Sequence, residues 1–179
     1  SRDWSSDVCS SDLRKFASLD HLSGGRAAWN LVTSTNIGEA FNFGREEHLE
    51  HDARYDRATE FARIVRALWD SWDDDAFVRD KAEGRYFKPD GVHFLNHKGE
   101  HFSVRGPLNV PRSPQGRPVM VQAGTSEVGQ ELAAEVADVL FATSQTIDNG
   151  QKLCKSLKGR LEKFGRAPDD IKVMPGLVP

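Results

Sequence analysis

The apolar positions of the chain follow two spacings, one typical of helices and the other of buried strands. Apolar side chains recur at every third or fourth position in residues 16–22, 54–72, 128–136 and 148–164, which places them on one face of a helix. Shorter apolar runs with the length of strands occupy residues 27–34, 119–121, 137–143 and 171–178. Val119, Met120 and Val121 show no polar alternation, which indicates a strand buried on both faces.

Strands therefore alternate with helices along the chain, and this order is typical of right-handed βαβ units in a parallel sheet. We predict an α/β fold, a partial TIM-type (β/α)8 barrel with about four parallel strands, three or four helices and an inserted hairpin. Because the chain begins in a helix and ends in an uncovered strand, we expect a fragment, about half of such a barrel. A doubly wound open sheet is the alternative, although no Gly-x-Gly-x-x-Gly follows the first strand.

Two segments lie outside this alternation. Residues 1–13 have neither a helical nor a strand period, so we expect a non-native or disordered tail before a barrel domain at 14–179. Residues 36–50 are rich in Gly, Asn and Glu and predict a surface loop. Asp52 then stands as a candidate cap for the helix that follows.

The segment between the second predicted helix and the apolar run at 119–121 predicts an inserted hairpin. Residues 92–95 and 101–104 read as strands, and the Asn-His-Lys-Gly at 96–99 reads as their turn. Three histidines are evenly spaced through this hairpin, at His93, His97 and His101. On strands they would not converge easily, so we predict no metal site.

Composition narrows the class of protein. Of the 179 residues, 38% are hydrophobic and 28% charged, which is typical of a globular protein, and no run approaches the ~18 apolar residues of a membrane span. The net charge of −3, without a basic run, argues against nucleic acid as a partner. Cys9 and Cys154 are far apart and have no CxxC neighbour, which fits a reducing cytoplasm.

The strongest candidate for chemistry is the turn just beyond the apolar run at 119–121. Gly124 allows the chain to approach a ligand closely, and Thr125 and Ser126 come just before a helical pattern. A helix N-terminus offers N–H groups without partners at the positive end of its dipole, so it binds phosphate readily. The alternative, that these hydroxyls only cap the helix, stays open.

Other candidate ligand residues are His51, Tyr55 and Asn30. His51 and Tyr55 are four positions apart and would share one helix face, where they could donate hydrogen bonds to a planar ligand. Asn30 lies near the end of the first predicted strand, where parallel folds place their chemistry. An exposed histidine beside a core-edge tyrosine, and a hydrogen bond from Asn30 to a neighbouring loop, are the structural alternatives.

Several short motifs occur in a characteristic order along the chain: FASLDHLSGGR at 16–26, WNLVTS at 29–34, RY at 54–55, LWDSW at 68–72, VRGPLN at 104–109, PRSPQGRP at 111–118 and QAGTSE at 122–127. Taken together, they resemble one family, the nitrilotriacetate and dibenzothiophene-sulfone monooxygenases among the bacterial luciferase-like flavin monooxygenases. The resemblance runs from about Lys15 to Pro179.

This resemblance implies a TIM-type barrel and a two-component enzyme. Reduced FMN, delivered by a separate NAD(P)H-dependent flavin reductase, would react with O2 to a C4a-hydroperoxide that oxygenates a small organic substrate. It also implies that His51 and Tyr55 contact the flavin and that Ser126, with Thr125 beside it, binds the FMN phosphate. His51 would be the catalytic residue that manages a proton. A homo-oligomer stays open.

Two other functions compete with this one. An unrelated phosphate-binding TIM-barrel enzyme would use the same turn, but it would need an acid/base Lys or Glu at a strand end, and none stands out. A non-catalytic truncated remnant would bind nothing. The family positions expected to hold the flavin ring lie before Arg14, so we expect the fragment alone to be inactive, and the motifs do not identify the substrate.

Overall fold

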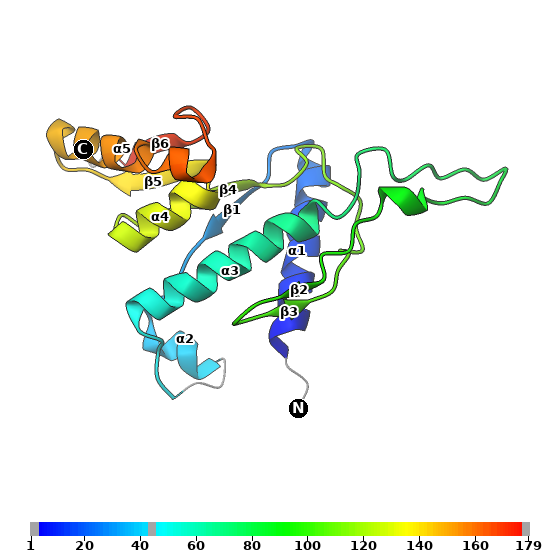
Figure 1. The fold of residues 1–179 in the computed structure, drawn as a ribbon, viewed down its shortest axis with the longest axis horizontal. Coiled ribbons are helices and arrows are strands. Elements are labelled where there is room, and N and C mark those ends of the chain that lie inside the picture. Colours follow the sequence, from blue (N-terminus) through cyan, green and yellow to red (C-terminus); the bar gives the residue numbers. More distant parts are fainter. Residues whose placement is uncertain (1–3, 43–45, 177–179) are drawn as a thin grey trace. The chain divides into compact units, whose positions relative to one another are not determined.

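The structure is a computed structural model that describes residues 4–42 and 46–176 (Figure 1). Its chain divides into two compact units. The first unit combines Ser1–Trp29 with Glu60–Val119, and the second combines Asn30–Thr59 with Met120–Pro179. All residues of the candidate phosphate turn belong to the second unit.

Helices and strands alternate largely as the apolar pattern predicts. The helices are α1 (Trp4–Ser23), α2 (Ile37–Asn42), α3 (His51–Trp69), α4 (Glu127–Val136) and α5 (Ile147–Lys158), with 3₁₀ turns η1 (Pro89–Gly91) and η2 (Leu161–Phe164). The strands are β1 (Ala28–Leu31), β2 (His97–Lys98), β3 (Ser103–Val104), β4 (Val119–Gln122), β5 (Val139–Thr143) and β6 (Lys172–Gly176). A four-stranded sheet runs in the order β1-β4-β5-β6, and β5 pairs in parallel with both β4 and β6. The predicted α/β class with a parallel sheet is confirmed.

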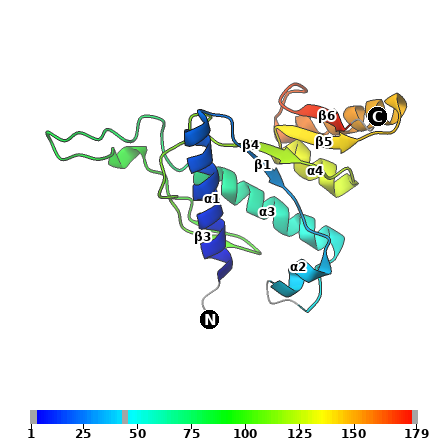
Figure 2. The ribbon, with the colours of Figure 1, turned by 180° about the vertical axis from the view of Figure 1, so that it is seen from behind.

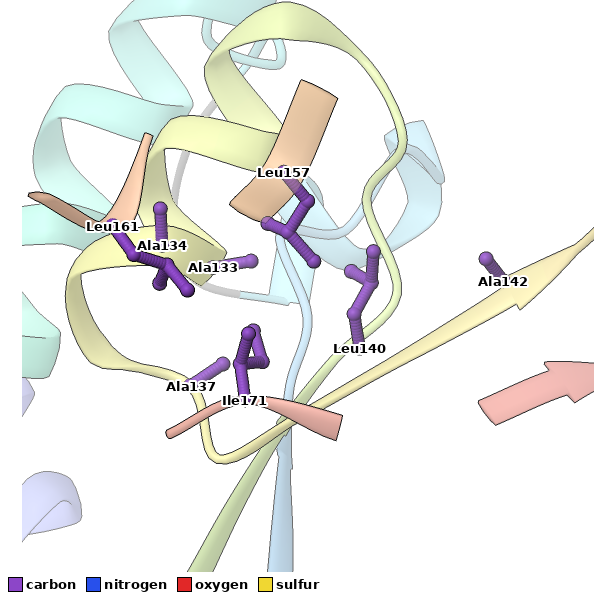
Figure 3. Close-up of a cluster of buried hydrophobic side chains, with 8 residues drawn as sticks. All are labelled: Ala133, Ala134, Ala137, Leu140, Ala142, Leu157, Leu161 and Ile171. Atoms are coloured by element: carbon purple, nitrogen blue, oxygen red, sulfur yellow. The ribbon is translucent and has the colours of Figure 1, made fainter. Parts of the chain in front are cut away.

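The core of the second unit lies between the sheet and the helices that follow β4 and β5. Leu140 and Ala142 point to the same face of β5, because side chains alternate along a strand. Figure 3 shows Leu140 and Ile171 meeting Leu157 of α5 and Ala133 of α4. Figure 2 shows α4 and α5 with β5 and β6 from behind. This burial holds the later part of α4 and the end of α5 against β5.

The C-terminal end of α4 is closed by one arginine. Arg166 donates from Nη1 to the carbonyl of Ala134 at 2.8 Å and from Nη2 to that of Ala137 at 2.7 Å. The last carbonyls of a helix have no partner within the helix, and a cation there also suits the negative end of the dipole. Arg166 therefore satisfies the end of α4 opposite to the candidate site.

The first unit is built on an aromatic cluster around Trp29. Its ring lies 6.2 Å from that of Phe16, 6.0 Å from Phe61 and 5.8 Å from Trp69, mostly in tilted or edge-on geometries. Such pairs add to the area that aromatic side chains bury. The cluster joins α1, β1 and the later turns of α3.

A buried carboxylate joins α1 to the segment before β4. Asp20 is fully buried and accepts hydrogen bonds from the Ala27 N–H at 3.1 Å and from Gln115 Nε2 at 2.6 Å. Burial alone would raise the pKa of Asp20, but its hydrogen bonds outweigh burial and hold the pKa below the usual value.

Glu60 on α3 fastens the β2–β3 hairpin. Its carboxylate accepts from His97 Nε2 at 2.8 Å and from the N–H groups of His101 and Phe102 at 2.9 and 3.0 Å. Burial opposes ionisation, but these hydrogen bonds lower the pKa of Glu60 to about 2. At Gly99 a Cβ atom would lie 2.1 Å from the Glu60 carboxylate, so a larger residue there would displace the Glu60 side chain.

Several predicted boundaries are wrong. The loop predicted at 36–50 contains α2, and α3 begins at His51, so Asp52 lies within the helix and does not cap it. The hairpin turn runs from Gly99 to Phe102, where the Gly99 N–H donates to the Phe102 carbonyl. The first strand of the hairpin is therefore His97–Lys98 and not 92–95, while β3 lies within the predicted 101–104.

The ends of three predicted elements also differ from the structure. The first helix begins at Trp4, while the assignment of residues 1–13 as non-native stays a prediction. The helix predicted at 148–164 is divided into α5 and η2, and Gly165 ends η2 in the left-handed region, with φ 67°. The last two residues of the strand predicted at 171–178 lie outside the described residues.

We expect Glu60→Gln to destabilise the chain by about 1–2 kcal/mol near neutral pH, because three donors lose an ionised acceptor. A folded pKa of about 2 lies below the usual value of 4.5, so the stability from Glu60 is complete above pH ~5 and is lost as the pH falls towards 2. Urea denaturation from pH 7 to pH 2 should show the two proteins converging. Glu100→Gln, an exposed change on the same hairpin, is the control, and a difference that does not depend on pH contradicts this role.

Candidate functional site

The candidate site is the turn that joins β4 to α4. β4 ends at Gln122, which is 2% exposed, and α4 begins at Glu127, with Ser126 as its N-cap. Ser126 has an extended backbone, and its Oγ accepts from the Gly129 N–H at 3.2 Å. The predicted passage from buried strand to helix N-terminus is confirmed. Ser126 also caps the helix, and its binding of phosphate stays a prediction.

The amides at the start of α4 divide into paired and unpaired groups. Those of Gly129 and Gln130 donate to the side chain and the carbonyl of Ser126. The structure records no acceptor, among the residues it describes, for the N–H groups of Ser126, Glu127 and Val128. Ser126 and Glu127 are exposed. The first turn of α4 therefore keeps donors that an anion can use, at the positive end of the helix dipole.

Close packing under the turn explains why Gly124 has no side chain. A Cβ atom on Gly124 would lie 2.5 Å from the hydroxyl of Tyr55 and 2.6 Å from Nε2 of Gln122. It would also lie 3.2 Å from the Cα of Gly129, whose own Cβ would meet the Gly124 backbone at 2.9 Å. The turn and the first turn of α4 are thus in backbone contact, and Tyr55 reaches them.

His51 and Tyr55 lie together on the first turns of α3, as their spacing predicts. Their ring centroids are 5.0 Å apart, at an interplanar angle of 51°. Tyr55 is 8% exposed, while the His51 side chain is 48% exposed. Nδ1 of His51 lies 2.8 Å from Oδ1 of Asp52, so Nε2 is the ring nitrogen that stays available to a ligand.

Asn30 is the candidate that the structure does not join to the others. It is exposed on β1, which neighbours β4 in the sheet. Within the described ranges no recorded hydrogen bond links Asn30 to the turn at Gly124, Thr125 and Ser126. Its role in binding stays a prediction.

An ion-pair cluster lies beside the turn. Glu127, in the first turn of α4, pairs with Arg160, and Arg160 also donates to Glu131 at 3.2 Å. Lys163 pairs with Glu131 as well. The bond to Glu127 is the largest cause of the raised pKa of Arg160, and the bond from Lys163 is the largest cause of the lowered pKa of Glu131. The negative charge that would repel an anion at this turn is therefore balanced by a cation.

Sequence reasoning missed the side chains that support the turn from below. Gln122 Oε1 accepts from the Gly124 N–H at 2.6 Å, and Gln130 Nε2 donates to the Thr125 carbonyl at 2.8 Å. Both glutamines are buried, and neither stood out from a helical or strand pattern. Gly129 did carry a signal, because a glycine inside a helix usually has a packing reason.

Two other features of the described residues bear on the class of site. The hairpin histidines have different partners: His93 pairs with Asp73, and His97 with Glu60. Over the described ranges, no group of three or more His, Cys, Asp or Glu side chains is arranged to hold a metal ion. None of the helices in those ranges has both the length and the apolar character of a membrane span.

We expect Gly124→Ala to destabilise the chain by about 1–3 kcal/mol, because the methyl group has no room beneath the turn. Gly150→Ala on α5 is the matched control. Its Cβ would meet only Ser144, at 3.6 Å, and alanine favours a helix, so this variant should gain about 0.5–1 kcal/mol. Urea denaturation measures both changes, and equal stability of Gly124→Ala and the unmodified chain contradicts the close packing.

Comparison with known proteins identifies the family. The family model described as luciferase-like monooxygenase matches residues 13–179. Nitrilotriacetate monooxygenase component A of Aminobacter aminovorans is 56% identical over 92% of this chain and 36% of its own length. Dibenzothiophene-sulfone monooxygenase of Rhodococcus erythropolis is 50% identical over 93% of this chain and 37% of its own length. The chain thus spans little more than a third of the length of these relatives.

Solved structures agree with this. A long-chain alkane monooxygenase matches with a TM-score of 0.89 and 41% identity, over 94% of this chain and 39% of the other. A riboflavin lyase, solved with modified FMN and riboflavin, matches with a TM-score of 0.86 and 38% identity, over 93% of this chain and 37% of the other. The predicted fold, part of a TIM-type barrel, is confirmed by these neighbours, and the chain belongs to the luciferase-like monooxygenase family.

Proposed function

We propose that this chain forms the phosphate-binding side of a reduced-FMN site in a monooxygenase that uses O2 to oxidise a small organic substrate. The observation that carries this proposal is the turn from Gly124 to Ser126, which follows a buried strand and has exposed amides and two hydroxyl groups. Membership of the luciferase-like monooxygenase family supports flavin as the ligand of this turn and argues against an unrelated phosphate-binding barrel.

The residues present fit a phosphate group. The donors of Ser126, Glu127 and Val128 lack recorded acceptors within the described residues, and the Thr125 hydroxyl stands beside them. Gly124 has no side chain, so the turn packs closely on Tyr55 and on the first turn of α4. Glu127 is the one opposing charge in the turn, and its pairing with Arg160 reduces the repulsion.

Each residue has a distinct task in this proposal. Ser126 and Thr125 hold the phosphate with their hydroxyls and nearby N–H groups. Tyr55, packed against Gly124, and His51, in contact with Tyr55, face the flavin itself. Bound reduced FMN would supply the electrons that activate O2. Asp52 orients the His51 ring so that Nε2 can exchange a proton with the reacting group.

The same proposal covers the activity, the substrate and the partners that a protein as long as these relatives would have. The reduced flavin would come from a separate NAD(P)H-dependent flavin reductase in the cytoplasm, and assembly into a homo-oligomer is compatible with it. Nitrilotriacetate monooxygenase carries the word component in its name, which supports a two-component system. A remnant that binds nothing is the remaining alternative, and flavin titration separates the two.

We expect the chain to bind reduced FMN weakly and at least tenfold more tightly than reduced riboflavin, because only FMN carries the phosphate. Ser126→Ala should remove most of this preference. Thr146→Ala is the matched control, since Thr146 caps a different helix, α5, in the same way. Anaerobic calorimetric titration gives the affinities. Equal affinities of the unmodified chain for FMN and riboflavin would falsify the phosphate site.

We also expect His51→Ala to impair oxygenation in a complete enzyme. Residues 13–179 can replace the matching segment of the Aminobacter nitrilotriacetate monooxygenase component A, to which this chain is 56% identical. In that graft, with reduced FMN supplied, His51→Ala should lower formation of oxidised product by about 100-fold, the usual contribution of a positioned proton donor or acceptor. His21→Ala, on the exposed side of α1, should leave it unchanged. Unaltered product yield with His51→Ala removes the proton role.

A further inference from the structure

Gln130 is a buried amide next to the phosphate turn, with no role in the function proposed so far. It lies one turn into α4 and is 6% exposed. Its Nε2 donates to the Thr125 carbonyl at 2.8 Å, and its backbone N–H donates to the Ser126 carbonyl at 2.8 Å. Of the two ends of the Gln130 amide, only the NH₂ group can donate to a carbonyl, so the Thr125 carbonyl fixes Nε2 as the end that points to the turn.

The bond to Thr125 sets the direction of the next N–H. The peptide that joins Thr125 to Ser126 is planar and trans, so its C=O and N–H point in opposite directions. With the Thr125 oxygen held towards the buried Gln130, the Ser126 N–H must point away from the protein interior. Ser126 is exposed, so this donor faces the side where an anion can approach.

If the Thr125–Ser126 peptide rotated, its dipole would point the other way and the turn would present an oxygen to an anion. A turn residue in solvent can exchange the orientation of its peptide at little cost, because water satisfies either side. The rotated peptide would present the Thr125 oxygen, and its lone pairs would repel a phosphate. The bond from Gln130 selects the orientation that presents a donor.

The oxygen of the Gln130 amide indicates that this residue does not serve the stability of the fold alone. Oε1 of Gln130 is buried and has no hydrogen-bond partner in the structure. A buried acceptor without a donor is costly, and an apolar side chain of similar size would avoid that cost. Retaining an amide here makes sense if its donor serves the turn.

We propose that Gln130 is a positioning residue for flavin phosphate binding, which aims the Ser126 N–H at the anion by holding the Thr125 carbonyl. This inference rests on the proposed function, because it presumes a phosphate at the turn. It predicts that Gln130 matters for the phosphate and not for the flavin ring. It also predicts that removing the amide does little harm to folding, since the lost hydrogen bond is offset by removal of the orphaned oxygen.

The test compares Gln130→Met and Gln130→Leu with the unmodified chain of 179 residues. Leu132→Met, a buried change of similar size on the same helix and away from the turn, is the matched control. Affinities for reduced FMN and for reduced riboflavin are measured anaerobically, and thermal unfolding is followed without ligand. The expected result is an FMN affinity reduced about tenfold by both Gln130 variants, with riboflavin affinity unchanged. Their unfolding midpoints should stay within about 4 °C of the unmodified chain.

Three results would overturn the proposal. If the unmodified chain prefers FMN and the Gln130 variants keep that preference, the positioning role is wrong while the phosphate site stands. If the variants lose affinity for FMN and riboflavin equally, or unfold at much lower temperature, Gln130 is a structural residue only. If the unmodified chain shows no preference for FMN, the proposed function fails, and this inference fails with it.

Discussion

The candidate site depends on one constraint: a strand that is buried in the sheet is followed directly by backbone N–H groups that need hydrogen-bond partners. A strand buried in a parallel sheet must leave the core through a turn, and the helix that follows begins with N–H groups that the helix itself cannot satisfy. In this chain β4 and α4 are packed so closely that Gly124 and Gly129 are in backbone contact. The backbone N–H groups of the first turn of α4 are consequently held at the surface by the packing of the turn on the helix.

Side chains from three parts of the chain stabilise the turn between β4 and α4. From below, Gln122 and Gln130 hold one N–H and one carbonyl of the turn, so its peptides have fixed orientations. From α3, the hydroxyl of Tyr55 closes the space under Gly124. From the segment after α5, Arg160 pairs with Glu127 and balances the only acidic group in the turn. Rigidity, close approach and charge balance are what an anion site on exposed amides requires.

Local patterns predicted the elements that carry the candidate site, and they failed where tertiary contacts decide. The unbroken run at Val119–Gln122 and the helix after Ser126 follow from periodicity, and so does the shared face of His51 and Tyr55. Short α2 lacks a full period, and the hairpin turn is set by Glu60, distant in sequence. Gln122 and Gln130 gave no signal, because a buried polar residue is recognised only by its partner.

The most direct measurement of the central claim is residue-level mapping of the bound phosphate by amide NMR. FMN added to the ¹⁵N-labelled chain should shift the amide resonances of Ser126, Glu127 and Val128 progressively to saturation, while riboflavin at the same concentration leaves these three resonances in place. Shifts confined to other parts of the chain, or the same shifts with riboflavin, would show that the turn after β4 does not hold the phosphate.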